Sequence, residues 1–279
     1  MYDGASPSDL SLAQRAVGRL EIGFRRRAAG RTALSRLYQQ GCLKVRFPRP
    51  SSGEPPTAVL VNSSGGVAPG DRLEISATLE AGAAATIAGQ AAERFYRAAP
   101  KSPPARLRHH LTIGPGAALE WLPQEAILFD RSALDRALNI DLAPDASLLA
   151  VEALIFGRRA MGEEVRSGFL RDRISLRRAG QLILEDTLRL EGPIAEALDR
   201  PAIAAGARAL ATILHVGPPA DLDALRALSV PGVVAGASAF DGLLIVRLAA
   251  RDGAALRAAL IGALAILRPG RALPRVWLC

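Results

Sequence analysis

The feature that most constrains the fold is an alternation of apolar and polar residues that recurs along most of the chain. Apolar side chains occupy every second position, or nearly so, in segments 43–47, 73–79, 107–113, 170–176 and 182–190. Alternation with a period of two places one set of side chains on each face of a β-strand. Because antiparallel sheets commonly bury one face only, the pattern predicts a mainly β fold of layered antiparallel sheets.

A short turn pattern recurs between the predicted strands. Residues 79–83, 113–117 and 142–146 share the order apolar, any residue, Ala or Pro, Gly or Asp, Ala. Gly and Asp accept the backbone angles that tight turns require. The recurrence predicts stacked hairpins, a layered architecture. The alternative is a set of unrelated hairpins in a glycine-rich β protein.

The C-terminal part has a different texture. Residues 218–228 predict a short helix with Pro at its start, and residues 233–248 predict a hairpin around Asp241-Gly242. A longer helix is expected over 252–268, capped by Asp252 and ended by Pro269-Gly270. The apolar stripe of this helix is a candidate either for core packing or for docking a partner protein. Its candidate docking residues are Leu256, Leu260 and Leu264.

Length and composition limit the domain organisation. The chain has 279 residues, which suits one large β domain. We expect a mobile tail at 1–12 and a single domain at 13–279, with β layers over about 15–215 and the two helices over about 216–279. The two cysteines cannot form a disulfide framework, and neither a signal peptide nor an apolar run of 18 residues is seen. These observations predict a cytoplasmic protein without a membrane span.

The charge is strongly basic and carried by arginine. Lys and Arg number 35 against 27 Asp and Glu, which gives a net charge of +8, and Lys44 and Lys101 are the only lysines. An Arg-rich surface suits an acidic protein partner or a nucleic acid. No run of five basic residues and no aromatic interleaving occurs, so a partner-facing or solvated surface is favoured and nucleic-acid binding is not expected. The positive mean hydropathy of +0.18 also favours apolar surface held for a partner.

Enzyme signatures are mostly missing. The Gly-x4-Gly-Lys-Ser/Thr sequence of a phosphate-binding loop does not occur. Segment 236–240 ends in Phe where a nucleophile elbow has Gly. His109 and His110 are neighbours on a predicted strand, so they point to opposite faces and cannot bind one metal together. A lone His215 in an apolar run suits a structural role better than a metal or partner contact.

One loop has the composition of a site. In 62–71, Asn, Ser and Asp accompany three glycines, and such side chains bind loop amides while glycine lets backbones approach closely. The loop either lines a site or forms a complex hairpin. An independent β-fold hydrolase that uses Ser63 or Ser64 with a distant histidine is the alternative function.

Two acidic residues interrupt apolar faces. Glu152 lies in the apolar run 148–156, and Asp186 falls on the same face as Leu184 and Leu188. A buried carboxylate is costly unless it is paired or hydrated. Arg158 or Arg159 is the expected partner of Glu152, and an internal polar path is the alternative. Carboxylate oxygens of this kind pass a divalent cation transiently but do not select nickel.

Several motifs together resemble the UreD family of urease accessory proteins, called UreH in some organisms. The matches occur in the family's order and span about residues 17–277. They include Val61-Asn-Ser-Ser-Gly-Gly66 with Gly70-Asp71, Gln90 with Phe95-Tyr96-Arg97, Glu120-Trp-Leu-Pro-Gln124 with Ile127-Leu-Phe129, Glu152 with Phe156-Gly-Arg158 and Gly162-Glu163, and Pro274-Arg-Val-Trp277. Ser63, Glu93-Arg94 and Glu125 depart from the residues that are usual in the family.

The resemblance implies a function that composition and spacing do not. It implies a non-enzymatic, β-rich scaffold with two helices that joins UreF and the GTPase UreG, docks on urease apoprotein (UreABC), and assists GTP-dependent nickel insertion. It also implies that nickel passes transiently through the protein, with Glu152 and Asp186 as candidates for that route, while no cofactor stays bound. A dimer of the accessory complex is a further implication. The motif positions expected to matter are Asn62, Ser63, Gly65, Gly66, Gly70, Asp71, Gln90, Glu120, Pro123, Gln124, Gly157, Arg158, Gly162 and Glu163.

Overall fold

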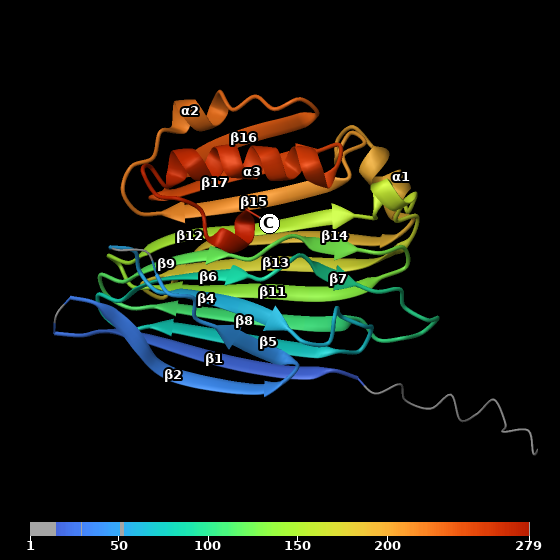
Figure 1. The fold of residues 1–279 in the computed structure, drawn as a ribbon. Helices are drawn as coiled ribbons and strands as arrows, with labels where there is room; N and C mark the ends of the chain where they lie inside the picture. Colours follow the sequence, from blue (N-terminus) through green and yellow to red (C-terminus); the bar gives the residue numbers. More distant parts are fainter. Residues whose placement is uncertain (1–14, 29, 51–52, 279) are drawn as a thin grey trace, which may run out of the picture.

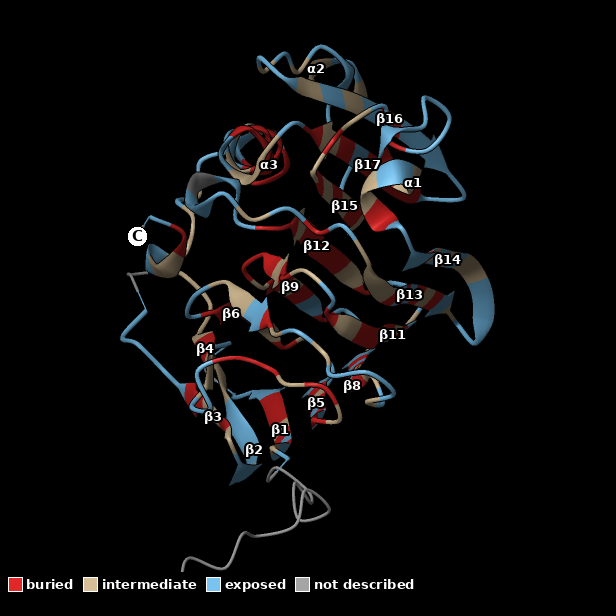
Figure 2. Cartoon of the chain, turned by 90° about the vertical axis from the view of Figure 1, so that its right-hand side faces the viewer, coloured by how far each residue is buried: buried red, intermediate tan, exposed pale blue. Residues whose placement is uncertain are grey.

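Two β-sheets stacked face to face form the body of the protein. The computed structural model describes residues 15–28, 30–50 and 53–278. Figure 1 shows the long strands lying across the molecule, and Figure 2 shows the two sheets nearly end on, with the apolar core between them. The mainly β, layered fold predicted from the alternation is confirmed. The predicted tail at 1–12 lies outside the described residues.

The first sheet has seven strands in the order β14-β13-β11-β8-β5-β1-β2. Its inner face is apolar and its outer face carries most of its charged residues, as the alternation predicts. Its strands are β1 (Val17–Arg26), β2 (Thr32–Gly41), β5 (Arg72–Leu79), β8 (Ala105–Ile113), β11 (Ala133–Leu142), β13 (Gly168–Arg178) and β14 (Gln181–Gly192).

The second sheet has ten strands. Eight follow the order β16-β17-β15-β12-β9-β6-β4-β3, and β7 and β10 extend it beside β12. Its strands are β3 (Leu43–Arg46), β4 (Thr57–Asn62), β6 (Ala84–Gly89), β7 (Glu93–Phe95), β9 (Ala118–Leu122), β10 (Ala126–Leu128), β12 (Ser147–Phe156), β15 (Ala209–Val216), β16 (Val233–Phe240) and β17 (Leu243–Ala250).

The direction of the central strands corrects the sequence prediction. Neighbouring strands run parallel from β1 through β5, β8 and β11 to β13 in the first sheet. They also run parallel from β4 through β6 and β9 to β12 in the second. The outermost pairs of the first sheet, β1–β2 and β13–β14, are antiparallel, and each contains a register shift. Alternation reports which side chains are buried but not strand direction, and here a parallel sheet leaves one face to solvent.

The recurring turns join the two sheets instead of closing hairpins. Each one leads from a strand of the seven-stranded sheet to a strand of the ten-stranded sheet: β5 to β6, β8 to β9 and β11 to β12. The turns stack on one another through backbone hydrogen bonds, with Gly82 N donating to Pro115 O and Ala143 N to Ile113 O, both at 2.8 Å. The predicted repeat therefore exists, but its unit is not a hairpin. Each unit is one coil, made of a strand from each sheet and the turn between them.

Helices cover the outer face of the ten-stranded sheet near the C-terminus. The predicted long helix is α3 (Gly253–Leu267), capped by Asp252, and it packs on β15 and β17. The predicted short helix is α2 (Leu222–Arg226). A further helix, α1 (Ile194–Asp199), and two 3-10 turns, Arg159–Met161 and Arg275–Trp277, complete the described elements. Six residues are too few to show a helical period, so α1 was missed.

The leucine stripe of α3 is core. Leu256, Leu260 and Leu264 are fully buried in a second apolar cluster, together with residues of β12, β15 and β17. The docking role considered for these three residues is therefore corrected, because this folded chain offers a partner none of their surface. Ile261 lies on the exposed side of the same helix.

Candidate functional site

Three charged side chains lie buried between the two sheets. Arg136 of β11 and Asp172 of β13 are direct cross-strand neighbours in the seven-stranded sheet, and Glu152 of β12 faces them from the ten-stranded sheet. Their exposed fractions are 5%, 9% and 5%. Arg136 donates from Nε and Nη2 to the two oxygens of Asp172, at 2.8 and 2.6 Å. We call Arg136, Glu152 and Asp172 the charged triad.

The triad's charges depend on one another. Arg136 Nη1 lies 2.6 Å from Glu152 Oε2, and Trp121 Nε1 donates to Glu152 Oε1 at 2.9 Å. Burial raises the pKa of Glu152 above its usual value, Arg136 opposes this rise, and Asp172 adds to it. Burial would lower the pKa of Arg136, but Asp172 and Glu152 outweigh it and raise that pKa. Arg136 is therefore charged at every working pH.

Two cavities meet at the triad. The first, of about 310 Å³, lies toward β3–β8 and is lined by Arg136 and Glu152 among others. The second, of about 500 Å³, lies toward β13–β17 and is lined by Glu152 and Asp172. Glu152 lines both, so the triad forms the partition between two hollows in the space between the sheets.

Asp186 lies at the second cavity, as Glu152 does. It is half-buried on β14 and forms an ion pair with Arg247 of β17 at 2.9 Å, which joins the two sheets across the cavity. The two acids singled out by sequence are thus brought to one cavity. The partner expected for Glu152 was wrong: the ion pair is with Arg136, whereas Arg158 pairs with Glu163 at 2.6 Å.

A histidine lines the first cavity. His109 is 8% exposed, and its ring lies 5.1 Å from that of Trp121 between centroids. Burial, together with the charge of Arg136, lowers the pKa of His109 to about 3, so the imidazole is neutral near pH 7. His109 Nδ1 and Glu152 Oε2 are the buried side-chain atoms without a hydrogen-bond partner among the described residues.

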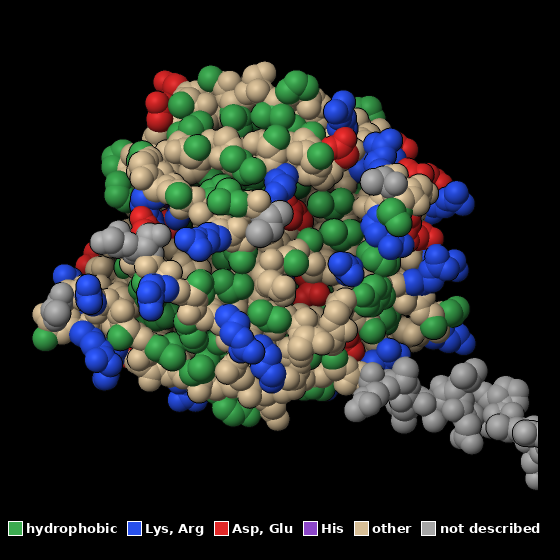
Figure 3. Space-filling view, in the orientation of Figure 1, with side chains coloured by type: hydrophobic (Ala, Val, Ile, Leu, Met, Phe, Trp, Pro, Cys, Tyr) green, Lys and Arg blue, Asp and Glu red, His purple; other side chains and the backbone are tan. Residues whose placement is uncertain are grey.

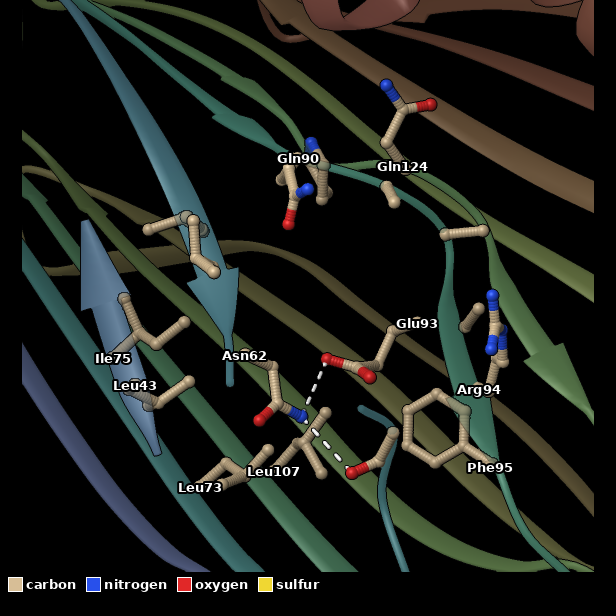
Figure 4. A pocket seen from close by; sticks show the side chains of 18 of the residues that line it. Leu43, Asn62, Leu73, Ile75, Gln90, Glu93, Arg94, Phe95, Leu107 and Gln124 are labelled. Carbon is tan, nitrogen blue, oxygen red and sulfur yellow. Dashed lines mark hydrogen bonds between the residues drawn. The ribbon is translucent and has the colours of Figure 1, made fainter. Parts of the chain in front are cut away.

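The mouth of the first cavity is built by the predicted loop. Asn62 Nδ2 donates to Glu93 Oε2 at 3.1 Å and to Gly66 O at 3.3 Å, as Figure 4 shows. Gln90 lies on the same rim and is exposed. Burial raises the pKa of Glu93, and the hydrogen bond from Asn62 opposes the rise. The loop therefore does line a cavity, as the sequence analysis considered.

The rest of this loop is held by its own hydrogen bonds. Asp71 Oδ1 accepts from Ala16 N at 2.8 Å, and its Oδ2 accepts from Ala68 N at 2.7 Å. Gly65, Gly66 and Gly70 have positive φ. A Cβ on Gly66 would lie 2.5 Å from the ring of Tyr96, so only glycine lets these segments approach.

The serines of the loop serve it structurally. Ser63 Oγ donates to Cys42 O at 3.0 Å. Ser64 Oγ donates to Asn62 Oδ1 at 2.6 Å and lies 2.8 Å from Gly66 O. Each hydroxyl is directed at a carbonyl or amide oxygen and not at an imidazole nitrogen. Among the described residues, the hydrogen bonds of these two serines therefore do not include the imidazole base that the hydrolase alternative requires.

Two further motifs join this loop at one end of the sheets. Tyr96 Oη donates to Gly65 O at 2.6 Å, and its ring packs edge-on against Phe129 at 5.3 Å. The Arg158 guanidinium lies 3.9 Å above the ring of Phe129. Gly157 and Gly162 have positive φ and shape the turn that holds Glu163 against Arg158. These motif positions form one continuous support beside the first cavity.

The Glu120–Gln124 motif anchors the C-terminal segment. Glu120 lies on the outer face of β9, where Arg268 and Arg271 pair with it at 2.9 and 2.6 Å. Burial opposes the effect, but hydrogen bonds from Arg268 and Thr86 hold the pKa of Glu120 below its usual value.

Gln124 extends this anchor to the rim of the first cavity. Its Nε2 donates to Val276 O at 2.7 Å, and Arg257 donates to its Oε1 at 2.9 Å. Pro123 and Gln124 both line the first cavity. The C-terminal segment therefore braces one wall of that cavity.

The surface and the remaining ligand sets add little. On the face shown in Figure 3, Lys and Arg side chains are scattered among apolar and uncharged atoms. Over the described ranges, no group of three or more His, Cys, Asp or Glu side chains is placed to hold a metal. In the same part of the chain, no helix is long and apolar enough to cross a membrane.

Sequence reasoning missed Arg136 and the importance of Asp172 and His109. A weak signal existed for each, because Asp172 and His109 alternate with buried apolar residues and Arg136 lies in the apolar strand β11. No spacing in the sequence predicts that residues 136, 152 and 172 meet, because they lie on three strands of two sheets.

Comparisons with known proteins all point to one family. The sequence model of the family described as UreD urease accessory protein matches residues 16–278. A urease accessory protein UreD from Methylobacterium sp. (strain 4-46) is 46% identical over 272 residues, covering 95% of each chain. UreD of Agrobacterium fabrum is 42% identical over 264 residues (95% and 92% of the two chains), and UreD of Chelativorans sp. is 44% identical over 279 residues (99% and 97%).

Proposed function

The chain belongs to the UreD urease accessory protein family, and on that premise we propose that it is a scaffold for nickel insertion into urease. In this proposal it acts with UreF and the GTPase UreG on urease apoprotein in the cytoplasm, and a dimer of the accessory complex is the working assembly. The chain itself performs no catalysis, and GTP hydrolysis is supplied by the partner. Nickel is cargo and not a resident cofactor.

One observation carries the proposed route: the two cavities between the sheets share Glu152. Oxygen ligands at Glu152 and Asp186 suit a divalent cation in transit. Each is held by an arginine, Arg136 or Arg247. In this route a cation replaces the arginine as the partner of each carboxylate. When the cation has left, the arginine neutralises the carboxylate again.

The role is tested by urease activation. A host that carries a urease operon without its own UreD is supplied with this chain and its cognate partners, or with the partners alone. We expect urease activity and urease-bound nickel only when the chain is present. Equal nickel loading without the chain would contradict the proposed function.

The route is tested by changes at the acids. Asp186→Asn removes a charge from the second cavity, and Glu185→Gln is its matched control, because Glu185 is the adjacent residue on the opposite face of β14. We expect the accessory complex to assemble in both variants and nickel incorporation to slow only in Asp186→Asn. Glu152→Gln should act as Asp186→Asn does. Normal activation in both cavity variants would leave the scaffold role intact and remove the route.

A further inference from the structure

Two unsatisfied atoms occur in the first cavity. Buried polar groups in folded proteins almost always have a hydrogen-bond partner, so each exception asks for an explanation. Over the described residues the buried side-chain exceptions are His109 Nδ1 and Glu152 Oε2, and both residues line the first cavity. They come from different sheets, His109 from β8 and Glu152 from β12.

Trp121 contacts both residues. Its ring packs against His109 at 5.1 Å, and its Nε1 donates to Glu152 Oε1 at 2.9 Å. That hydrogen bond fixes Oε1, so Oε2 is the oxygen that faces Arg136. Oε2 lies 2.6 Å from Arg136 Nη1 without receiving an aligned hydrogen bond. Arg136 already has two hydrogen bonds to Asp172, so it stays paired if Glu152 takes another partner.

From these atoms we propose that His109 Nδ1 and Glu152 Oε2 form a transient binding site for a borderline divalent cation of the nickel class. The site rests on the proposed function for the identity of its cation, and it adds a nitrogen ligand to a route that otherwise offers only oxygen. The remaining coordination positions are filled by water, because two protein ligands are too few for a resident ion.

Ligand chemistry gives this site its selectivity. Imidazole nitrogen binds nickel, copper, zinc and iron well, whereas magnesium and calcium prefer oxygen ligands. Carboxylates alone discriminate less between magnesium and nickel than a site that includes an imidazole. With both carboxylates ionised, the triad also carries one more negative than positive charge, which favours a cation. His109 thus supplies the discrimination that Glu152 and Asp186 lack.

The test measures metal binding directly. The full chain, in its accessory complex and without an oligohistidine tag, is titrated with nickel chloride in the presence and absence of excess magnesium chloride. His109→Leu removes the nitrogen ligand, and His110→Leu is the matched control on the exposed face of the same strand. We expect His109→Leu to weaken one nickel site at least about tenfold, and His110→Leu and magnesium to leave it unchanged.

A second measurement needs no variant to fold. Crystals of the wild-type protein soaked in nickel chloride should show anomalous density at the nickel edge beside His109 Nδ1. Ordered water alone at that position would overturn the proposal, and so would nickel binding that is the same in His109→Leu and wild type. Displacement of nickel by magnesium at equal concentration would also overturn it.

The two proposals fail separately. If urease activation depends on the chain but nickel binding does not depend on His109, the scaffold function stands and this site falls. If nickel binds at His109 but activation occurs without the chain, the site stands and the proposed function falls.

Discussion

The protein has two apolar cores, one on each face of its ten-stranded sheet, and only one of them contains buried charges and cavities. The core between that sheet and α3 consists of Ala, Leu, Ile and Val packed around Leu256, Leu260 and Leu264, with Trp277 at its edge. The core between the two sheets is larger, and it contains the charged triad, His109 and two cavities. β12 contributes to both: Val151 faces the helix side, and Glu152 faces the other sheet.

The difference separates stability from function. Close-packed apolar side chains stabilise without a need for charge, as beneath α3. Buried charges cost desolvation that their pairing only partly offsets, and cavities forfeit van der Waals contacts. Because buried charges and cavities do not add stability, we infer that the larger core keeps them for function.

The largest expected effect comes from breaking the triad. Arg136→Met leaves Glu152 and Asp172 buried without their cation, and we expect a loss of about 3–5 kcal/mol in the free energy of unfolding, measured by urea denaturation. Arg171→Met is the control, because the Arg171 side chain is half exposed, and its partner Asp135 keeps a second arginine, Arg108, when Arg171 is removed. It should behave almost as wild type. Similar losses in both variants would mean that burial does not set the strength of the triad.

The apolar core should respond to volume. Leu260→Ala opens a hole beneath α3, and we expect the free energy of unfolding to fall by about 2–5 kcal/mol, measured in the same denaturation assay. Ile261→Ala, on the side of α3 where Ile261 is 39% exposed, should cost about 0.5 kcal/mol or less. Nickel delivery should be normal in any Leu260→Ala protein that folds. A selective defect in delivery would show that the α3 core contributes to the route.

His109 should make the inter-sheet core lose stability in mild acid. The pKa of His109 is about 3 in the folded chain, whereas in the unfolded chain the imidazole takes up a proton near its usual pKa of 6.5. Acid therefore favours unfolding, and stability falls as the pH drops below about 6.5, by about 1.4 kcal/mol per pH unit from this group.

Variants isolate that contribution. In metal-free buffer between pH 6.5 and 4.5, the free energy of unfolding should fall less in His109→Leu than in wild type. The difference in slope should be at most about 1.4 kcal/mol per pH unit, the value for one bound proton. His110→Leu should follow the wild-type curve, because His110 is exposed on the outer face. Parallel curves for wild type and His109→Leu would contradict the burial of a neutral imidazole.

The smallest change in stability is expected when the whole triad becomes apolar. The combined variant Arg136→Met, Glu152→Leu and Asp172→Leu exchanges the charges for hydrophobic side chains of similar size. Its free energy of unfolding should equal or slightly exceed that of wild type, while nickel incorporation into urease is lost. A variant that is stable and also active in urease activation would show that nickel delivery does not depend on the buried charges.

Sequence reasoning reached the local structure and stopped at long-range pairing. Inward residues such as Leu111 and Leu176, the helix after Asp252 and the turn at Asp241-Gly242 follow from spacing and capping alone. Strand direction did not follow, because parallel and antiparallel strands show the same alternation. Glu152 and Asp186 were found because a carboxylate interrupts an apolar face, but Arg136 as the partner of Glu152 depends on how two sheets stack.

The antiparallel pairs with register shifts at both edges of the seven-stranded sheet have a consequence for solubility. A parallel coil whose corner turns stack one on another has no intrinsic length, and its last strand is a template for another molecule's first. Here β2 and β14 fold back on their neighbours, and a bulge interrupts each of these pairs, at Gly23/Phe24 and at Leu176/Arg177. A bulge twists an edge away from regular pairing. The two edges of this sheet thus disfavour pairing with a second molecule, so the repeat does not extend into a fibre.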